Sequence, residues 1–110
     1  MNIINWSSSE KKIAKQAFDI ALKREYAALL DQLKSTAAKA ESQDDIWDIH
    51  DYLTEQRKLI IQKYDYRYSQ LMFLFSVLLR DKWLEEKDIA GLAEEKLVEV
   101  RRIAYLLSRE

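Results

Sequence analysis

The first ninety residues of the chain contain neither glycine nor proline, and Gly91 is the only glycine in the whole sequence. Sheets and hairpins need such residues to punctuate their turns. Helix interiors, in contrast, are built best without either residue. The sequence therefore predicts an all-α protein, and its length of 110 residues suits one domain or one subunit of an oligomer.

A long first helix is expected from Ser7 to about Glu41. Ser7 and Glu10 have the Ser-x-x-Glu spacing of a capping box, in which each side chain accepts a hydrogen bond from the other residue's backbone N–H. Apolar residues then recur every three or four positions, as on one face of a helix. They are Ile13, Ala17, Ile20, Ala21, Tyr26, Leu29, Leu30 and Leu33. Such a helix would be roughly 45 Å long. A monomer of this size cannot cover it, so we expect a homodimer or a higher oligomer.

A second helix is expected to begin at Asp44 or Asp45, after a short turn at Ser42 and Gln43. Aspartates at a helix start accept hydrogen bonds from free backbone N–H groups and meet the positive end of the helix dipole. Short connections favour antiparallel neighbours. The first two helices should therefore form a long hairpin over residues 7–64.

Two stripes run side by side along the second helix when its residues are placed about 100° apart. One stripe is apolar and is the candidate dimer seam; it contains Ile46, Ile49 and Leu53, and continues to Ile60 and Tyr64. The other combines an indole, an imidazole, a carboxylate and a guanidinium, from Trp47, His50, Asp51, Thr54 and Arg57. A face that meets only solvent more typically carries Glu, Lys and Gln. We interpret the second stripe as a recognition surface.

Residues 65–110 are expected to form a compact helical head. Asp65 is the best candidate for the cap of a third helix, although the pattern leaves open whether the second and third helices are continuous. Residues 71–75 are apolar all round, so this stretch should be enclosed on every side at the centre of the head. Phe73 is the candidate for a second partner contact, at the edge of that core.

The end of the chain is expected to contain one short helix over residues 85–90 and a last helix over residues 93–107. Gly91 lies between them, where a glycine in the left-handed conformation commonly ends a helix. Leu97, Val100, either Ile103 or Ala104, and Leu107 should point inward from the last helix.

Several functional classes are disfavoured by what the sequence lacks. Without cysteine it has no disulfide, thiol nucleophile or usual zinc site. A net charge of −1 gives no general attraction to nucleic acid or to anionic membranes. No signal pattern or membrane-spanning apolar run is present. We expect a cytoplasmic protein with no metal, no cofactor, no nucleic-acid partner and no membrane insertion.

His50 and Asp51 do not make a convincing catalytic pair. Neighbouring helix residues point about 100° apart, so the aspartate should not orient the imidazole as in a catalytic triad. No glycine-rich phosphate loop and no Glu-x-x-His metal motif is present. We therefore expect that the protein is not an enzyme. From spacing alone, Trp47 could equally be a core or seam aromatic, and Arg57 could form a surface ion pair.

The central run from Asp44 to Leu79 carries a family pattern: an acidic pair, Trp, His-Asp, an aromatic residue, Leu, Arg, a Lys-Tyr-Asp corner and an apolar helix. The matching residues are Asp44, Asp45, Trp47, His50, Asp51, Tyr52, Leu53, Arg57, Lys63, Tyr64, Asp65 and 71–79. Trp6, Ser7 and Glu10 near the start, and Leu84, Gly91, Leu92, Glu95, Lys96 and Leu97 near the end, also fit. The chain resembles the cyanobacterial fluorescence recovery protein family over nearly its whole length.

This resemblance implies an all-helical homodimer that binds the light-activated orange carotenoid protein, chiefly at its C-terminal domain. It would speed the return of that protein from its red, quenching form to its orange resting form, and promote its release from the phycobilisome. Trp47, His50, Asp51 and Arg57 would contact the partner, and Ile46 would belong to the dimer seam. The alternative is a family homologue that acts as a helical adaptor or chaperone-like dimer on a different protein.

Overall fold

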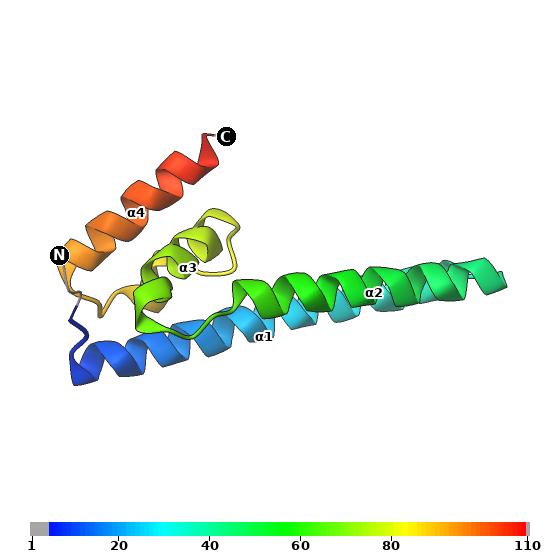
Figure 1. Ribbon diagram of the computed structural model, residues 1–110, viewed down its shortest axis with the longest axis horizontal. Coiled ribbons are helices and arrows are strands. Elements are labelled where there is room, and N and C mark those ends of the chain that lie inside the picture. Colours follow the sequence, from blue (N-terminus) through cyan, green and yellow to red (C-terminus); the bar gives the residue numbers. More distant parts are fainter. Residues whose placement is uncertain (1–4, 110) are drawn as a thin grey trace.

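The computed structural model describes residues 5–109, and the secondary structure of this part is entirely helical (Figure 1). The elements are α1 (Ser8–Lys39), α2 (Gln43–Lys63), α3 (Tyr68–Arg80), the short 3-10 helix η1 (Glu86–Ile89) and α4 (Glu94–Ser108). The predicted all-α class is confirmed.

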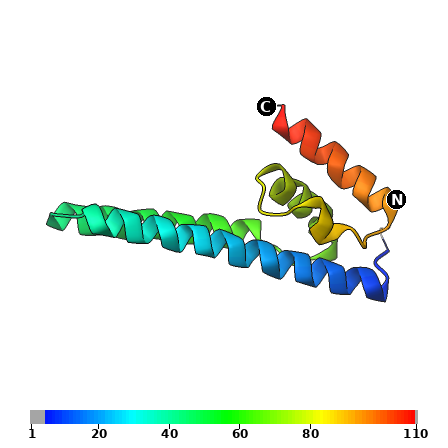
Figure 2. The ribbon, with the colours of Figure 1, turned by 180° about the vertical axis from the view of Figure 1, so that it is seen from behind.

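The first two helices form the predicted hairpin, which both ribbon views show as a long projection from a smaller head (Figures 1 and 2). Both helices start at a capping box. Ser7 accepts a hydrogen bond from the N–H of Glu10 and donates its own N–H to the Glu10 carboxylate. Ser42 and Asp45 repeat this arrangement. The second helix therefore begins at Gln43, one or two residues before the predicted start at Asp44 or Asp45.

The second and third helices are separate, because the chain is not helical from Tyr64 to Arg67. The prediction that Asp65 caps α3 is wrong: Arg67 occupies the cap position, and Asp65 accepts hydrogen bonds from the Arg67 guanidinium. Tyr64 and Tyr66 pack edge-on against Phe18 of α1, with ring centroids 5.4 and 4.9 Å away. This packing holds the connection against α1.

The hydrophobic core lies in the head, between the N-terminal half of α1, the helices α3 and α4, and the η1 region. Its largest fully buried apolar side chains are Phe75, Leu71, Leu78, Leu84, Ile89 and Val100. The stretch 71–75 is thus central, as predicted, but it is not enclosed on every side. Phe73 is 52% exposed, because α3 is covered on the sides that meet α1 and α4 and open on another.

The buried part of α1 ends at Ala21. Ala17 and Ala21 are buried as predicted, whereas Ala14 and Phe18, which were not predicted, are also part of the core. Farther along, Tyr26 and Leu30 of the predicted stripe remain exposed. The head covers one half of α1 only, and we call the rest of the hairpin, residues 26–59, the arm.

Gly91 packs closely against α1 and does not have a left-handed backbone, so that prediction is wrong. A Cβ atom at this position would lie 2.0 Å from Cδ1 of Ile13, which is far inside contact distance. The described residue with a positive φ is Lys82, at 66°, in the turn after α3. Gly91 thus lets the segment before α4 approach α1 closely.

Within residues 5–109, no helix is long and apolar enough to cross a lipid bilayer. The same residues contain no group of three or more His, Asp or Glu side chains arranged to hold a metal ion.

Candidate protein-binding surface

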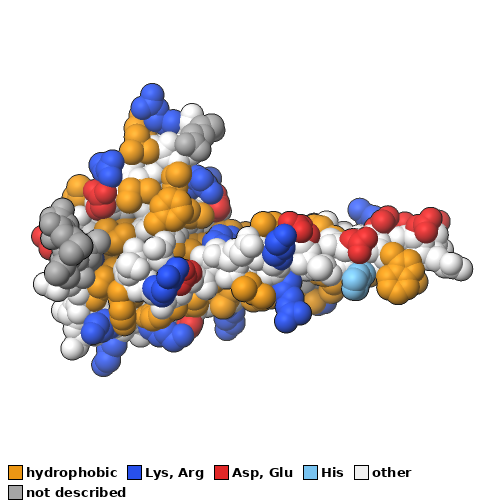
Figure 3. Space-filling model, viewed as in Figure 1, with side chains coloured by type: hydrophobic (Ala, Val, Ile, Leu, Met, Phe, Trp, Pro, Cys, Tyr) orange, Lys and Arg blue, Asp and Glu red, His pale blue; other side chains and the backbone are white. Residues whose placement is uncertain are grey.

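The predicted recognition residues share an open side of α2, and we call Trp47, His50, Asp51, Thr54 and Arg57 the α2 face. All five are exposed, and Trp47 is the most exposed tryptophan, at 62%. Figure 3 shows the single histidine projecting from the narrow arm beside a large hydrophobic side chain. The structure therefore brings all four predicted contact residues of α2 together on the surface.

Four of the five residues of the α2 face, Trp47, His50, Asp51 and Thr54, contact one another. The rings of Trp47 and His50 meet edge to face with centroids 6.0 Å apart. Nδ1 of His50 lies 3.3 Å from the Asp51 carboxylate, although we expected that this carboxylate should not orient the imidazole. Both side chains are exposed and bend toward each other around the outside of the helix. The Thr54 hydroxyl donates to the backbone carbonyl of His50, 2.9 Å away.

Carboxylates follow one edge of this surface. Asp44, Asp48, Asp51 and Glu55 are spaced three or four residues apart and are all exposed. The neighbouring Asp45 has a different role: hydrogen bonds from the backbone N–H groups of Glu41 and Ser42 lower the pKa of its carboxyl group. An exposed indole and guanidinium on one side of a helix, with carboxylates along its edge, can anchor another protein, since Trp and Arg often dominate interface energies.

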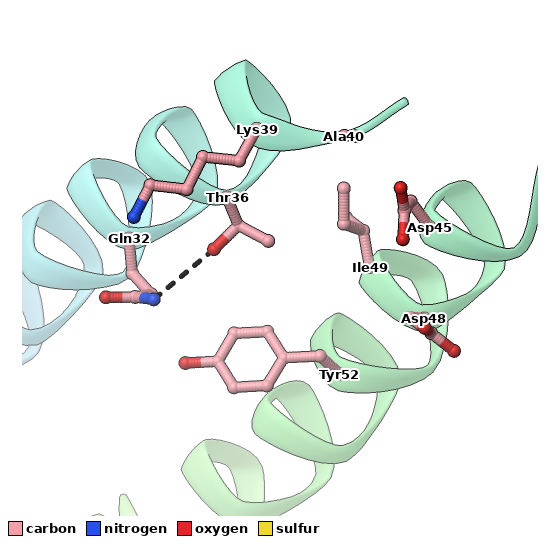
Figure 4. Close-up of a pocket in the computed structure, with 8 residues that line it drawn as sticks. All are labelled: Gln32, Thr36, Lys39, Ala40, Asp45, Asp48, Ile49 and Tyr52. Atoms are coloured by element: carbon pink, nitrogen blue, oxygen red, sulfur yellow. Dashed lines mark hydrogen bonds between the residues drawn. The ribbon is translucent and has the colours of Figure 1, made fainter. Parts of the chain in front are cut away.

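The candidate seam residues follow a line of α2 beside the α2 face. Ile49 and Leu53 are partly buried, whereas Ile46 is 58% exposed near the tip of the hairpin. Ile49 also lines a cavity of about 360 Å³ between the end of α1 and the start of α2 (Figure 4). Of the α2 residues, all of which the structure describes, only Ile60 is buried. The arm is therefore a pair of helices with little core of its own.

Phe73, the predicted second contact, lies at the opposite end of α2. It lines a groove of about 190 Å³ at the corner between α2 and α3, and we call this the Phe73 groove. The other lining residues are Gln62, Lys63, Asp65, Gln70, Leu74 and Val77. Gln62 follows Asp51 by eleven residues, which is close to three helical turns, so these two side chains lie along one line of α2. The α2 face thus leads toward the Phe73 groove.

A polar cluster that sequence reasoning missed joins α1 to the end of α2. Lys63 places its Nζ 2.6 and 2.8 Å from the two carboxylate oxygens of Glu25, and the Tyr64 hydroxyl donates to the same carboxylate at 2.8 Å. Burial, together with this hydrogen bond, raises the pKa of Tyr64. We call Glu25, Lys63 and Tyr64 the Glu25 cluster. The available signal was the Lys-Tyr pair at the end of the central pattern, which gave no indication of its partner.

Arg24, the residue before Glu25, holds the other side of the head. Its guanidinium donates to the Trp83 carbonyl at 3.0 Å and to the Asp88 carboxylate at 2.7 Å. The hydrogen bond to Asp88 raises the pKa of Arg24, and the same contact lowers the pKa of Asp88. Neighbouring residues of α1 thus fix both the end of α2 and the η1 region.

A buried ion pair joins the start of α1 to the start of α4. Nζ of Lys96 lies 3.1 and 3.0 Å from the two carboxylate oxygens of Glu10. The Glu10 carboxylate also accepts the N–H groups of Ala93 and Ser7. The Ala93 hydrogen bond is the largest cause that lowers the pKa of Glu10 from 4.5 to about 2. The sequence predicted the cap role of Glu10 but not its pairing with Lys96.

The comparisons with known proteins agree with this architecture. A family model described as "Photoprotection regulator fluorescence recovery protein" matches residues 6–104. The curated Fluorescence recovery protein of Synechocystis sp. PCC 6803 is 33% identical over 101 residues, which cover 92% of this chain and 93% of that protein.

Two solved structures show the same fold. The Fluorescence Recovery Protein of Fremyella diplosiphon has a TM-score of 0.86 and 35% identity, and the alignment covers 92% of this chain and 99% of that one. The protein from Synechocystis sp. PCC 6803 has a TM-score of 0.87 and 32% identity, with the same coverage. The resemblance predicted from the central motif is confirmed, and this chain belongs to the fluorescence recovery protein family of photoprotection regulators.

Proposed function

We propose that the protein is a non-enzymatic regulator of the orange carotenoid protein. It binds the light-activated form of that protein, chiefly at the C-terminal domain, and accelerates its return to the resting form. Release from the phycobilisome then ends quenching. It acts in the cytoplasm and needs no cofactor. The family, whose members are photoprotection regulators, supports this function at the level of its class.

The observation that carries the proposal is the exposure of Trp47 on the α2 face. A tryptophan carries roughly 150–250 Å² of surface, and hiding the open part of this one would contribute on the order of 3 kcal/mol to binding. Arg57 and Asp51 add charged groups that make the contact selective for a complementary surface. These groups occupy the positions at which the resemblance places partner contacts.

The mechanism is a shift between two conformations of the partner. A binding protein changes such an equilibrium only through its different affinities for the two states. The regulator would bind the open or intermediate carotenoid protein and hold its halves close to the closed geometry. This lowers the barrier to closure, and no covalent bond changes.

We further propose that the working form is a homodimer whose seam includes Ile46, Ile49 and Leu53. The arm exposes several large apolar side chains, a feature that marks surfaces that other proteins cover. They are Tyr26, Leu30, Ile46, Trp47, Tyr52 and Leu59, and Ile61 follows just beyond the arm. Packing against the arm of a second copy would cover part of this surface and give the long hairpin the core that it lacks.

The deciding experiment is the dark relaxation of a photoactivated orange carotenoid protein, followed by absorbance, with increasing amounts of this protein. We expect the relaxation rate to rise and then saturate, and Arg57→Leu to shift the curve to higher concentrations. No acceleration at saturating amounts of a folded helical protein would overturn the proposal. It would instead favour a family member with a different client, for which a pull-down from the native host is the next step.

A further inference from the structure

Glu25 lies where the arm meets the head, at the centre of a polar cluster between elements far apart in the sequence. Its side chain is 14% exposed and receives hydrogen bonds from both Lys63 and Tyr64. Phe18 packs edge-on against the Tyr64 ring at 5.4 Å, which confines that ring from a second direction. The Glu25 cluster therefore holds the last turn of α2 firmly against α1.

Within one subunit, few other contacts fix the rotation of α2 about its own axis. Within the helix, only Ile60 is buried, and it lies one turn before Lys63. Lys63 is also six residues after Arg57, less than two turns farther along the same rigid element. Loss of the contact between Lys63 and Glu25 would let α2 rotate or tilt, and the whole α2 face would move with it.

Lys63 takes part in both the Glu25 cluster and the Phe73 groove. It donates to Glu25 and, together with Gln62 and Phe73, lines the Phe73 groove. The same side chain thus separates the groove of the head from the surface of the arm. Two partner contacts that are held at a fixed spacing bind more tightly than the same contacts on loosely joined parts, because the second contact forms at a high effective concentration.

We infer that Glu25 is a positioning residue. Through Lys63 and Tyr64 it fixes the direction and rotation of α2, so that the α2 face and the Phe73 groove form one surface that a single partner contacts at two points. This inference rests on the proposed function. It adds that Glu25, which does not itself touch the partner, holds these two contacts at a fixed spacing within one subunit.

The first test reverses the charges of the Glu25 cluster. Glu25→Lys and Lys63→Glu should each raise the concentration for half-maximal acceleration of relaxation by about tenfold, the scale of coupling between contacting residues. The double variant restores an ion pair and should recover most of the loss. Asp19→Lys makes the same kind of change at an exposed site of α1 and should leave the curve unchanged. The maximal rate should change little in any of them.

A milder variant protects the test against misfolding. Tyr64→Phe removes one hydrogen bond and keeps the ring, and it should raise the half-maximal concentration by roughly threefold. Combination with Phe73→Ala supplies the readout that a simple loss of stability would not give. In the wild-type background Phe73→Ala should weaken binding strongly, and in the Glu25→Lys background it should add little, because the two contacts are already uncoupled.

Spin labels measure the geometry without the partner. The chain contains no cysteine, so labelled cysteines at positions 55 of α2 and 95 of α4 would be unique. With unlabelled protein in excess, the distance distribution should be narrow in the wild type, broad in Glu25→Lys and narrow again in the charge-reversed pair. A narrow distribution in Glu25→Lys, or additive effects of Glu25→Lys and Phe73→Ala, would overturn the inference. If the wild type does not accelerate relaxation of the carotenoid protein, the proposed function and the two-point contact with that protein are overturned. The spin-label distance distributions would still decide whether Glu25 positions α2.

Discussion

Replacement of Lys96 by methionine should destabilise the protein by about 3 kcal/mol near neutral pH. Loss of one partner of a buried ion pair costs about 3–5 kcal/mol, because the other charge is left without compensation. Lys96 and Glu10 are both less than 10% exposed and lie 3.0 Å apart. We choose the lower end of the range because the N–H groups of Ser7 and Ala93 would still donate to Glu10.

The effect should depend on pH in a defined direction. The pKa of Glu10 falls from 4.5 to about 2 on folding, so the folded state favours the ionised carboxyl group. Such a group adds stability above its unfolded pKa, and that stability is lost as the pH falls from 4.5 toward 2. The wild type should therefore weaken in this acidic window. The difference between the wild type and Lys96→Met should narrow there, because a protonated Glu10 no longer needs a counter-charge.

Urea unfolding followed by circular dichroism, at one fixed protein concentration, measures these differences. Lys87→Met is the matched control, since Lys87 pairs with Glu85 at an exposed site and should cost less than about 0.5 kcal/mol. The double variant Glu10→Gln/Lys96→Met should lose less stability than the sum of the two single variants, because it removes both buried charges together. If Lys96→Met costs less than about 1 kcal/mol, or if the double variant loses the sum of both single effects, the reasoning is refuted.

Three further predictions test other parts of the molecule. Ile46→Glu should yield monomers in sedimentation, because it places a charge in the proposed seam; an unchanged profile would remove Ile46 from that seam. Trp47→Leu should keep the helix content and the oligomeric state, yet weaken binding to the activated carotenoid protein at least tenfold in a titration; retained affinity would show that the indole is not an anchor. Gly91→Ala should cost about 1 kcal/mol in urea unfolding, because its methyl group forces the end of the Ile13 side chain to move, and Ile13→Val should restore part of it by removing the colliding Cδ1. Without that rescue, the requirement for glycine has another cause.

Local signals predicted the elements well. The two capping boxes determine where the hairpin helices begin, and each depends on residues only three positions apart. The long helices were predicted from the regular spacing of their apolar residues, because a helix with many turns repeats this spacing many times. The exposure of the α2 face also followed from its mixture of residue types, which does not suit a core. Its contact with a partner stays a prediction.

The remaining features depend on contacts across the chain, which periodicity does not encode. Phe18 is buried and Leu30 is exposed, although both lie on apolar turns of one helix, because the head docks on one half of α1. Gly91 follows a short helix. A glycine there can either end the helix in a left-handed conformation or let another segment approach closely, and the sequence pattern is the same in both cases. Only the position of Ile13 distinguishes the two. Glu25 has its partners 38 and 39 positions farther on.

The division of α1 into a covered half and an uncovered half has a consequence for its backbone dynamics. Backbone amides of α1 before Ala21 lie in helix turns that pack on the core, so they exchange only when the core opens. Amides toward Lys39 exchange after a local opening of the arm. Exchange with deuterium should therefore be slow at one end of this single helix and fast at the other. An assembly that covers the arm will slow exchange most at the fast end, so the two ends of one continuous helix respond differently to association.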